Sequence, residues 1–93
     1  MDIELLYFAE FKDITGKEKE NFNLNNSNLL ELIDQLFVKY NSIKKLIWDN
    51  QTNNLKKYVS IAVNGEMAHH KNKLLTKLSD GDKIAFLLPI SGG

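Results

Sequence analysis

Few side chains of this sequence could do chemistry on their own. Cysteine is absent, so thiolate catalysis, disulfides, iron–sulfur clusters and cysteine-based zinc sites are excluded. His69 and His70 are adjacent, point to opposite faces if they lie on a strand, and have no third ligand at a useful spacing, so we predict no metal site. Glu18 and Glu20 lack the burial expected around an acid–base pair, and we interpret them as a solvated strand face.

The end of the chain offers chemistry of another kind, through the terminal carboxylate of Gly93. Glycine has no Cβ, so a Gly-Gly end is narrow and can thread a closed pocket on another protein. Five residues at about 3.3 Å each give a reach of roughly 16 Å. Two glycines in the final positions occur by chance in roughly 0.5% of proteins. The pattern is typical of an extended C-terminal segment that reaches into a partner protein. This segment, called the arm below, consists of Pro89, Ile90, Ser91, Gly92 and Gly93.

Composition limits the class of protein that positions this arm. A chain of 93 residues with 43% apolar residues is expected to fold as one domain around one core. Its 12 basic and 12 acidic residues cancel, and every basic residue is lysine, so the guanidinium that reads guanine is missing and we do not expect specific DNA recognition. No apolar run approaches the roughly 20 residues of a membrane span, and the N-terminus lacks the basic start of a signal peptide. We expect a cytoplasmic protein.

The first half of the sequence predicts a β-hairpin followed by a helix. Residues 3–9 are rich in strand formers, 15–17 form a turn, and 20–24 alternate polar and apolar residues as a half-buried strand does. Apolar residues spaced three and four apart then predict an amphipathic helix of about 13 residues. Its N-cap is Ser27 or Asn28. A short helical turn follows, and residues 51–54 are expected to form a surface loop.

The second half returns to strands. Residues 58–63 alternate cleanly, and Asn64-Gly65 is a strong hairpin signal that lets 66–68 pair back. A turn at 80–82 precedes a strand at 83–88, which Pro89 ends because proline has no N–H to donate. This order of elements predicts an α+β domain with one helix packed across one face of a mixed sheet.

An exposed apolar patch is expected on the face of the sheet away from the helix. If Ile84 and Phe86 face the helix, then Leu87 points outward by strand alternation. Phe8 belongs to the outward set of the first strand, and Met67 follows the hairpin turn. These three side chains are candidates for a protein-docking surface. The alternative is that they cover a second small core.

Three blocks of the sequence, at residues 6–10, 63–67 and 80–93, resemble the small, sulfur-carrier subunit of molybdopterin synthase. The resemblance implies the ubiquitin-like β-grasp fold, an α+β fold in which one main helix packs across one face of a mixed sheet. It implies a single domain made of a β-grasp unit at residues 1–89 and a flexible Gly-Gly tail at 90–93.

The resemblance also implies a function. The Gly93 carboxylate would be adenylated by a ubiquitin-activating-type enzyme that consumes ATP, which gives a transient acyl-adenylate, and a sulfurtransferase would supply sulfur for a thiocarboxylate. The large subunit of molybdopterin synthase would receive that sulfur for its pterin, in an assembly of two large and two small subunits. The chain itself would be a non-catalytic carrier with no stably bound cofactor and no nucleic-acid or membrane partner. The family docks its partners at positions equivalent to Phe8, Met67 and Leu87.

Three alternatives stay open at this point. The chain could carry sulfur for thiamine synthesis or for tRNA thiolation. It could be a protein modifier whose activated glycine forms an isopeptide bond to a lysine of a target protein. It could also be a binding module with an inert tail. These functions differ in what becomes attached to the tail: sulfur alone for a carrier, and a lysine of another protein for a modifier.

Overall fold

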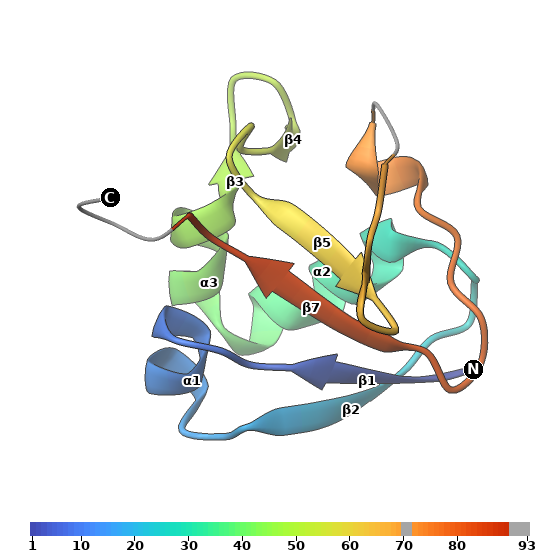
Figure 1. The fold of residues 1–93 in the computed structure, drawn as a ribbon. Coiled ribbons are helices and arrows are strands. Elements are labelled where there is room, and N and C mark those ends of the chain that lie inside the picture. Colours follow the sequence, from blue (N-terminus) through green and yellow to red (C-terminus); the bar gives the residue numbers. More distant parts are fainter. Residues whose placement is uncertain (70–71, 90–93) are drawn as a thin grey trace.

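A computed structural model describes residues 1–69 and 72–89 of the chain. Its main sheet has five strands in the order β2-β1-β7-β5-β6 (Figure 1). The central pair, β1 and β7, is parallel, and every other neighbouring pair is antiparallel, so the sheet is mixed. The strands are β1 (Asp2–Leu6), β2 (Lys19–Asn23), β5 (Ser60–Val63), β6 (Glu66–Met67) and β7 (Lys83–Leu87).

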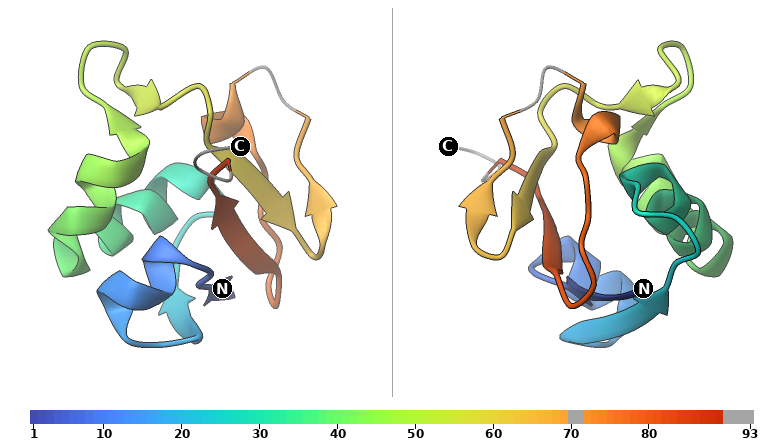
Figure 2. Two further views of the ribbon diagram at one scale, coloured as in Figure 1. Left: turned by 60° about the vertical axis from the view of Figure 1, so that its left-hand side comes forward. Right: turned by 90° about the vertical axis from the view of Figure 1, so that its right-hand side faces the viewer.

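Two consecutive helices, α2 (Leu29–Lys39) and α3 (Asn41–Ile47), cover one face of this sheet and leave the other face open (Figure 2). A two-stranded hairpin of β3 (Trp48–Asp49) and β4 (Asn54–Leu55) follows α3, and a 3₁₀ turn, η1 (Lys73–Leu75), precedes β7. The core lies between the helices and the sheet. Its fully buried side chains include Ile3, Leu5, Leu32, Leu36, Ile43, Ile61, Ile84 and Phe86. The predicted α+β architecture is therefore confirmed.

The start of α2 follows from its capping residues. The Asn28 side chain accepts a hydrogen bond from the backbone N–H of Glu31 (2.9 Å), which makes Asn28, and not Ser27, the N-cap. The Glu31 carboxylate in turn accepts from the backbone N–H groups of Asn25 (2.6 Å) and Asn26 (2.9 Å). These bonds lower the pKa of Glu31, with the bond from Asn25 contributing most. A carboxylate in the first turn also interacts favourably with the helix dipole.

The first hairpin contains a helix that the sequence did not predict. The expected pairing is confirmed, because Asp2 opposes Asn23 and Leu6 opposes Lys19. However, β1 ends at Leu6 rather than at residue 9, and a short helix, α1 (Glu10–Thr15), precedes the turn at Gly16. Gly16 has φ 70°, a left-handed conformation that ends helices at low cost. Such a short helix with one buried residue leaves too little periodicity to detect.

The predicted surface loop at 51–54 is also partly wrong, because Asn54 pairs with Asp49 in the β3–β4 hairpin. The hairpin at Asn64-Gly65 is confirmed, with φ angles of 53° and 82° at its two central residues. Among the described residues, no helix is long and apolar enough to span a bilayer.

Candidate functional site

Phe8, Met67 and Leu87 line one hollow on the open face of the sheet. They come from the segment after β1, from the short edge strand β6, and from the last residue of β7. The hollow has a volume of about 380 Å³. Its remaining lining residues are Leu6, Ala62, Gly65, Lys83 and Ala85. The structure thus brings together the three residues that the sequence placed on one patch.

The exposure of these residues follows strand alternation. Ile84 and Phe86 face the helices and are 0% and 2% exposed, whereas Leu87, next in the strand, is half-buried on the other face. Phe8 is 51% exposed and Met67 is 44% exposed. A large aromatic side chain left half in water beside other apolar groups is a feature of protein-binding surfaces. Their role in binding a partner stays a prediction.

A strained turn holds Phe8 in place. The Phe11 N–H donates to the Phe8 carbonyl (3.1 Å), which closes a four-residue turn. The first central residue of this turn, Ala9, has φ 49° and ψ −122°. These angles are those of a type II′ turn, in which this position favours glycine. Because Ala9 carries a Cβ, its backbone is strained in this conformation, directly beside the hollow.

We expect Ala9→Gly to raise the free energy of unfolding by about 1 kcal/mol, because glycine adopts this conformation without strain. Urea denaturation of both proteins measures the difference. Ala68→Gly is the matched control, since Ala68 is not among the described residues with positive φ, and there glycine should lower stability. An unchanged or lower stability for Ala9→Gly would show that the turn is not strained.

The predicted arm begins where the described chain ends. Leu88 is half-buried against the core, and Pro89 is exposed just beyond β7. The strand β7 runs toward the end of the molecule at which α1 and α3 lie, opposite the N-terminus (Figure 1). Ile90, Ser91, Gly92 and Gly93 lie outside the described residues. Their chemical role, and that of Pro89, stays a prediction.

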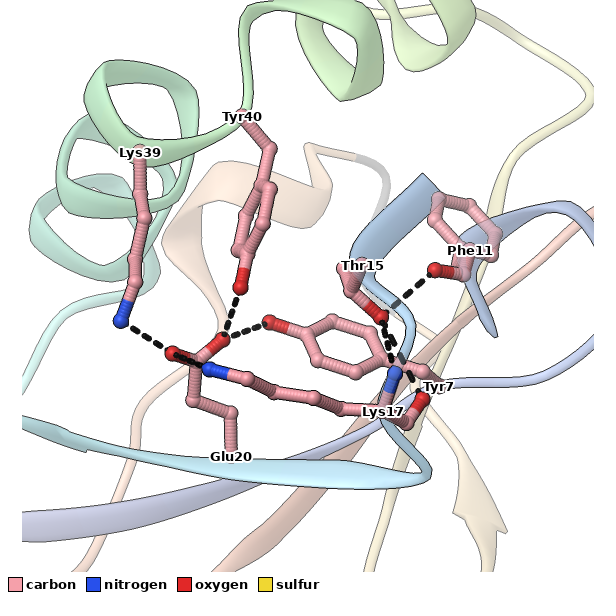
Figure 3. Close-up of polar contacts among 7 residues, drawn as sticks. All are labelled: Tyr7, Phe11, Thr15, Lys17, Glu20, Lys39 and Tyr40. Carbon is pink, nitrogen blue, oxygen red and sulfur yellow. Dashed lines mark hydrogen bonds and ion pairs between the residues drawn. The ribbon is translucent and has the colours of Figure 1, made fainter. Parts of the chain in front are cut away.

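One polar cluster was missed by the sequence analysis. Glu20 was interpreted as part of a solvated face, but its side chain is only 8% exposed, and this interpretation is wrong. Its Oε1 accepts hydrogen bonds from the hydroxyls of Tyr7 (2.8 Å) and Tyr40 (2.9 Å). Its Oε2 accepts from the ammonium groups of Lys17 (3.0 Å) and Lys39 (Figure 3). Glu18, by contrast, is 81% exposed as expected.

The cluster holds Glu20 in its ionised form. Burial raises the pKa of Glu20, but the hydrogen bonds from Lys39, Tyr7, Lys17 and Tyr40 outweigh it and lower the pKa to about 2. Burial, followed by the hydrogen bond to Glu20, raises the pKa of Tyr7 well above its usual range. Each carboxylate oxygen already has two donors, so Glu20 has little capacity left to act as a proton acceptor. The cluster joins the residue after β1 to β2 and to the end of α2, and we interpret its role as structural.

The histidines give no support for a metal centre. His69 is exposed, and His70 lies outside the described residues. Within residues 1–69 and 72–89, no group of three or more histidine, aspartate or glutamate side chains is placed to hold a metal ion.

The sequence and the fold are similar to those of known proteins. The sequence is 26% identical over 95 residues to small archaeal modifier protein 3 of Haloferax volcanii, and the match spans the whole of both chains. It is 27% identical over 94 residues to the molybdopterin synthase sulfur carrier subunit of Chlamydomonas reinhardtii, again over both whole chains. A solved complex of subunits 1 and 2 of the molybdopterin-converting factor of Helicobacter pylori contains a chain with the same fold. That chain has a TM-score of 0.62, 26% identity and full coverage of both chains.

The mixed sheet crossed by a helix and followed by a C-terminal segment beyond β7 is the ubiquitin-like β-grasp fold, as the resemblance implied. The model of the ThiS family matches residues 5–93. The chain therefore belongs to the ThiS family of small, ubiquitin-like sulfur-carrier proteins.

Proposed function

We propose that this protein carries sulfur for molybdopterin synthesis as a thiocarboxylate on Gly93. The observation that carries the proposal is the full-length similarity to a molybdopterin synthase sulfur carrier subunit, over a chain whose apolar hollow adjoins the start of the tail. Leu87 lines the hollow and lies two residues before Pro89, so a partner that docks there can also receive the tail.

The chemistry requires two partner-catalysed steps. A carboxylate is a poor electrophile, so an adenylating enzyme first joins the Gly93 carboxylate to the AMP moiety of ATP and releases pyrophosphate. A sulfide-level sulfur donor then attacks the carbonyl carbon, AMP leaves, and a thiocarboxylate remains. That sulfur is the nucleophile delivered to the pterin in the large synthase subunit. This chain provides no catalytic side chain and no bound cofactor, and its domain serves to position the tail.

Partner assembly is supported by the similarity to a chain of a two-subunit molybdopterin-converting factor complex. By analogy, the large subunit of molybdopterin synthase would cover the hollow and take up the tail. The assembly would pair two large with two small subunits in the cytoplasm.

Intact-protein mass spectrometry tests the proposal. The protein is incubated with a ubiquitin-activating-type adenylating enzyme, ATP and a sulfide donor, and compared with a variant that lacks Gly93. We expect a mass gain equal to replacing one oxygen by sulfur, in the full chain only. If an established carrier in the same mixture gains sulfur and this chain does not, the proposal is wrong.

A protein-modifier role is the second candidate, because the chain is equally similar over its whole length to a small archaeal modifier protein. In that case the adenylated glycine would be attacked by a lysine Nζ of another protein, with AMP as the leaving group. Trypsin cleaves after Lys83, the last basic residue, so peptide mass spectrometry of conjugates purified through a tag on this chain would detect residues 84–93 attached to target lysines. Its absence in cells that contain the thiocarboxylate would favour the carrier role alone.

A further inference from the structure

The outer edge of β2 offers backbone groups that no strand pairs with. β2 is the last strand of the main sheet on its side and has β1 as its one neighbour (Figure 1). Successive residues of an antiparallel strand direct their N–H and C=O groups alternately toward the neighbouring strand and away from it. The Leu24 N–H donates to the Met1 carbonyl (2.7 Å), so the even-numbered residues here face β1. The backbone groups of Lys19, Asn21 and Asn23 therefore point to the outer edge.

A groove with a volume of about 550 Å³ runs beside this edge, between β2 and α2. At one end, the Gln35 side chain donates from Nε2 to the Asn23 carbonyl (2.9 Å). At the other end, Lys39 pairs with Glu20, so α2 runs antiparallel to β2. Val38 lines the groove between these two contacts. It is 89% exposed, the highest value among the large apolar side chains that the structure describes.

Opposite charges flank Val38 along the helices. Asp34, Val38 and Lys44 line a second hollow that adjoins the groove, together with Phe37 and Asn41. Asp34 lies one turn before Val38 on α2, and Lys44 follows on α3. Within residues 1–69 and 72–89, neither Asp34 nor Lys44 takes part in an ion pair. The order along this stripe is therefore carboxylate, valine, ammonium, and both charges are available to another molecule.

The backbone of the β2 edge is complementary to a second copy of itself. A two-fold axis at Asn21 places this residue opposite Asn21 of the other copy, and Lys19 opposite Asn23. All three residues direct backbone groups to the edge, so each pair can exchange N–H···O=C bonds. Lysine opposite asparagine brings no like charges together, whereas an in-register parallel alignment would set Lys19 against Lys19. The antiparallel arrangement is therefore favoured.

The same axis makes the helices complementary. Val38 lies level with the middle of β2, so an axis at Asn21 brings the two Val38 side chains toward each other and removes them from water. The stripe of one copy then runs opposite to the stripe of the other. Asp34 of each copy faces Lys44 of the other copy, on both sides of the axis. A second copy thus supplies both charges in the required order, which favours it over an unrelated extended segment.

We propose that this chain forms a two-fold symmetric dimer through antiparallel pairing of β2 with β2 of a second copy, closed by Asp34–Lys44 ion pairs between the helices. The inference is independent of what the tail carries. The hollow at Phe8, Met67 and Leu87 has no lining residue on β2, α2 or α3, so the dimer leaves both hollows uncovered. One short strand and one helix stripe make a small contact, and we expect a dissociation constant on the order of 10 to 100 μM.

Sedimentation equilibrium of the full chain, from about 5 μM to about 1 mM, measures the association. Asn21→Pro removes an N–H that points away from β1, a position where an edge strand tolerates proline. We expect it to weaken association about tenfold or more, because the dimer needs this donor. Asn21→Ala keeps the N–H and is the matched control, which should associate as wild type does. Wild type that stays monomeric at the highest concentration, or folded Asn21→Pro that associates normally, overturns the proposal.

Charge reversal tests the contact between the helices. Asp34→Lys and Lys44→Asp each bring like charges together on both sides of the axis, and each should weaken association about tenfold or more. An equal mixture of the two variants should associate as wild type does, because both contacts of the mixed dimer then join unlike charges. If the mixture of the two folded variants stays monomeric, the Asp34–Lys44 pairing is wrong.

Phe8→Asp separates this dimer from self-association through the hollow. Phe8 lies outside the proposed contact, so Phe8→Asp should dimerise as wild type does. If Phe8→Asp abolishes the association, the two copies meet at the hollow and the pairing of β2 is overturned. Thermal melting establishes which variants fold. If Asn21→Pro does not fold, the mixture of Asp34→Lys and Lys44→Asp decides the question by itself.

Discussion

Phe8→Asp is expected to weaken binding to the adenylating enzyme by at least 100-fold and to leave the fold intact. Phe8 is 51% exposed in the free protein, so a polar replacement there should change the free energy of unfolding by no more than about 0.5 kcal/mol. In the complex, we expect the same position to become the centre of an apolar contact. Loss of a central aromatic anchor and burial of an unpaired carboxylate each weaken binding strongly.

The measurement combines titration calorimetry with thermal melting and circular dichroism. Leu75→Asp is the matched control, because Leu75 is an equally apolar residue, 65% exposed, on η1 and outside the lining of the hollow. It should bind as wild type does. Unfolding of Phe8→Asp would show that Phe8 belongs to the core. A folded variant that binds normally would show that the hollow is not the docking surface.

Glu20→Gln is expected to lower the free energy of unfolding by about 2 kcal/mol at pH 7. Two ammonium groups and two hydroxyls donate to the Glu20 carboxylate, and hydrogen bonds to a charged group contribute more than neutral ones do. The amide of glutamine can accept from the tyrosines, but its NH₂ group faces the two lysines. Because those lysines are about half exposed, water compensates part of the loss. A change of this size lowers the melting temperature by roughly 10 °C.

The pH dependence gives this prediction a distinct signature. The pKa of Glu20 is about 2 in the folded protein and near 4.5 when unfolded, so the unfolded chain binds more protons between those values. The stabilisation is therefore fully present above pH 4.5 and is lost as the pH falls toward 2. The free energies of unfolding of wild type and Glu20→Gln, measured by denaturation at each pH, should therefore converge as the pH falls over this range.

Glu18→Gln is the control for this pair of measurements. Glu18 is 81% exposed, and among the described residues its one ion pair is with Lys12 at 3.3 Å, so its replacement should change stability by less than about 0.5 kcal/mol at any pH. If the difference in the free energy of unfolding between wild type and Glu20→Gln stayed constant from pH 5 to 2, the acid-sensitive stability could not be assigned to the Glu20 carboxylate.

Much of the fold could be predicted because it depends on local patterns. Alternation at 83–88 and helical spacing after Asn28 assign faces without any knowledge of partners in space, since strand and helix geometry fix where successive side chains point. The same alternation placed Phe8 and Leu87 away from the core. The blocks at 6–10, 63–67 and 80–93 carried the family resemblance, and the family model matches residues 5–93.

Other features depend on distant segments meeting, and no local pattern reveals them. Glu20 reads as a solvated carboxylate because nothing near it in the sequence shows that Tyr40, 20 residues away, will donate to it. Ala62 and Ala85 are ordinary small residues until the pairing of β5 with β7 sets them side by side. The strain at Ala9 arises from a turn that few sequences place on alanine.

The sequence by itself therefore determined the fold class, the family and the residues of the exposed apolar patch, since these follow from periodicity and from residues close together in the chain. Only the tertiary structure decided that the Glu20 carboxylate accepts hydrogen bonds from residues of distant segments. It also decided that a hollow lined by Ala62, Ala85 and Lys83 lies beside the start of the tail. Strand register and helix packing create both features, and register is a property of pairs of segments rather than of any one of them.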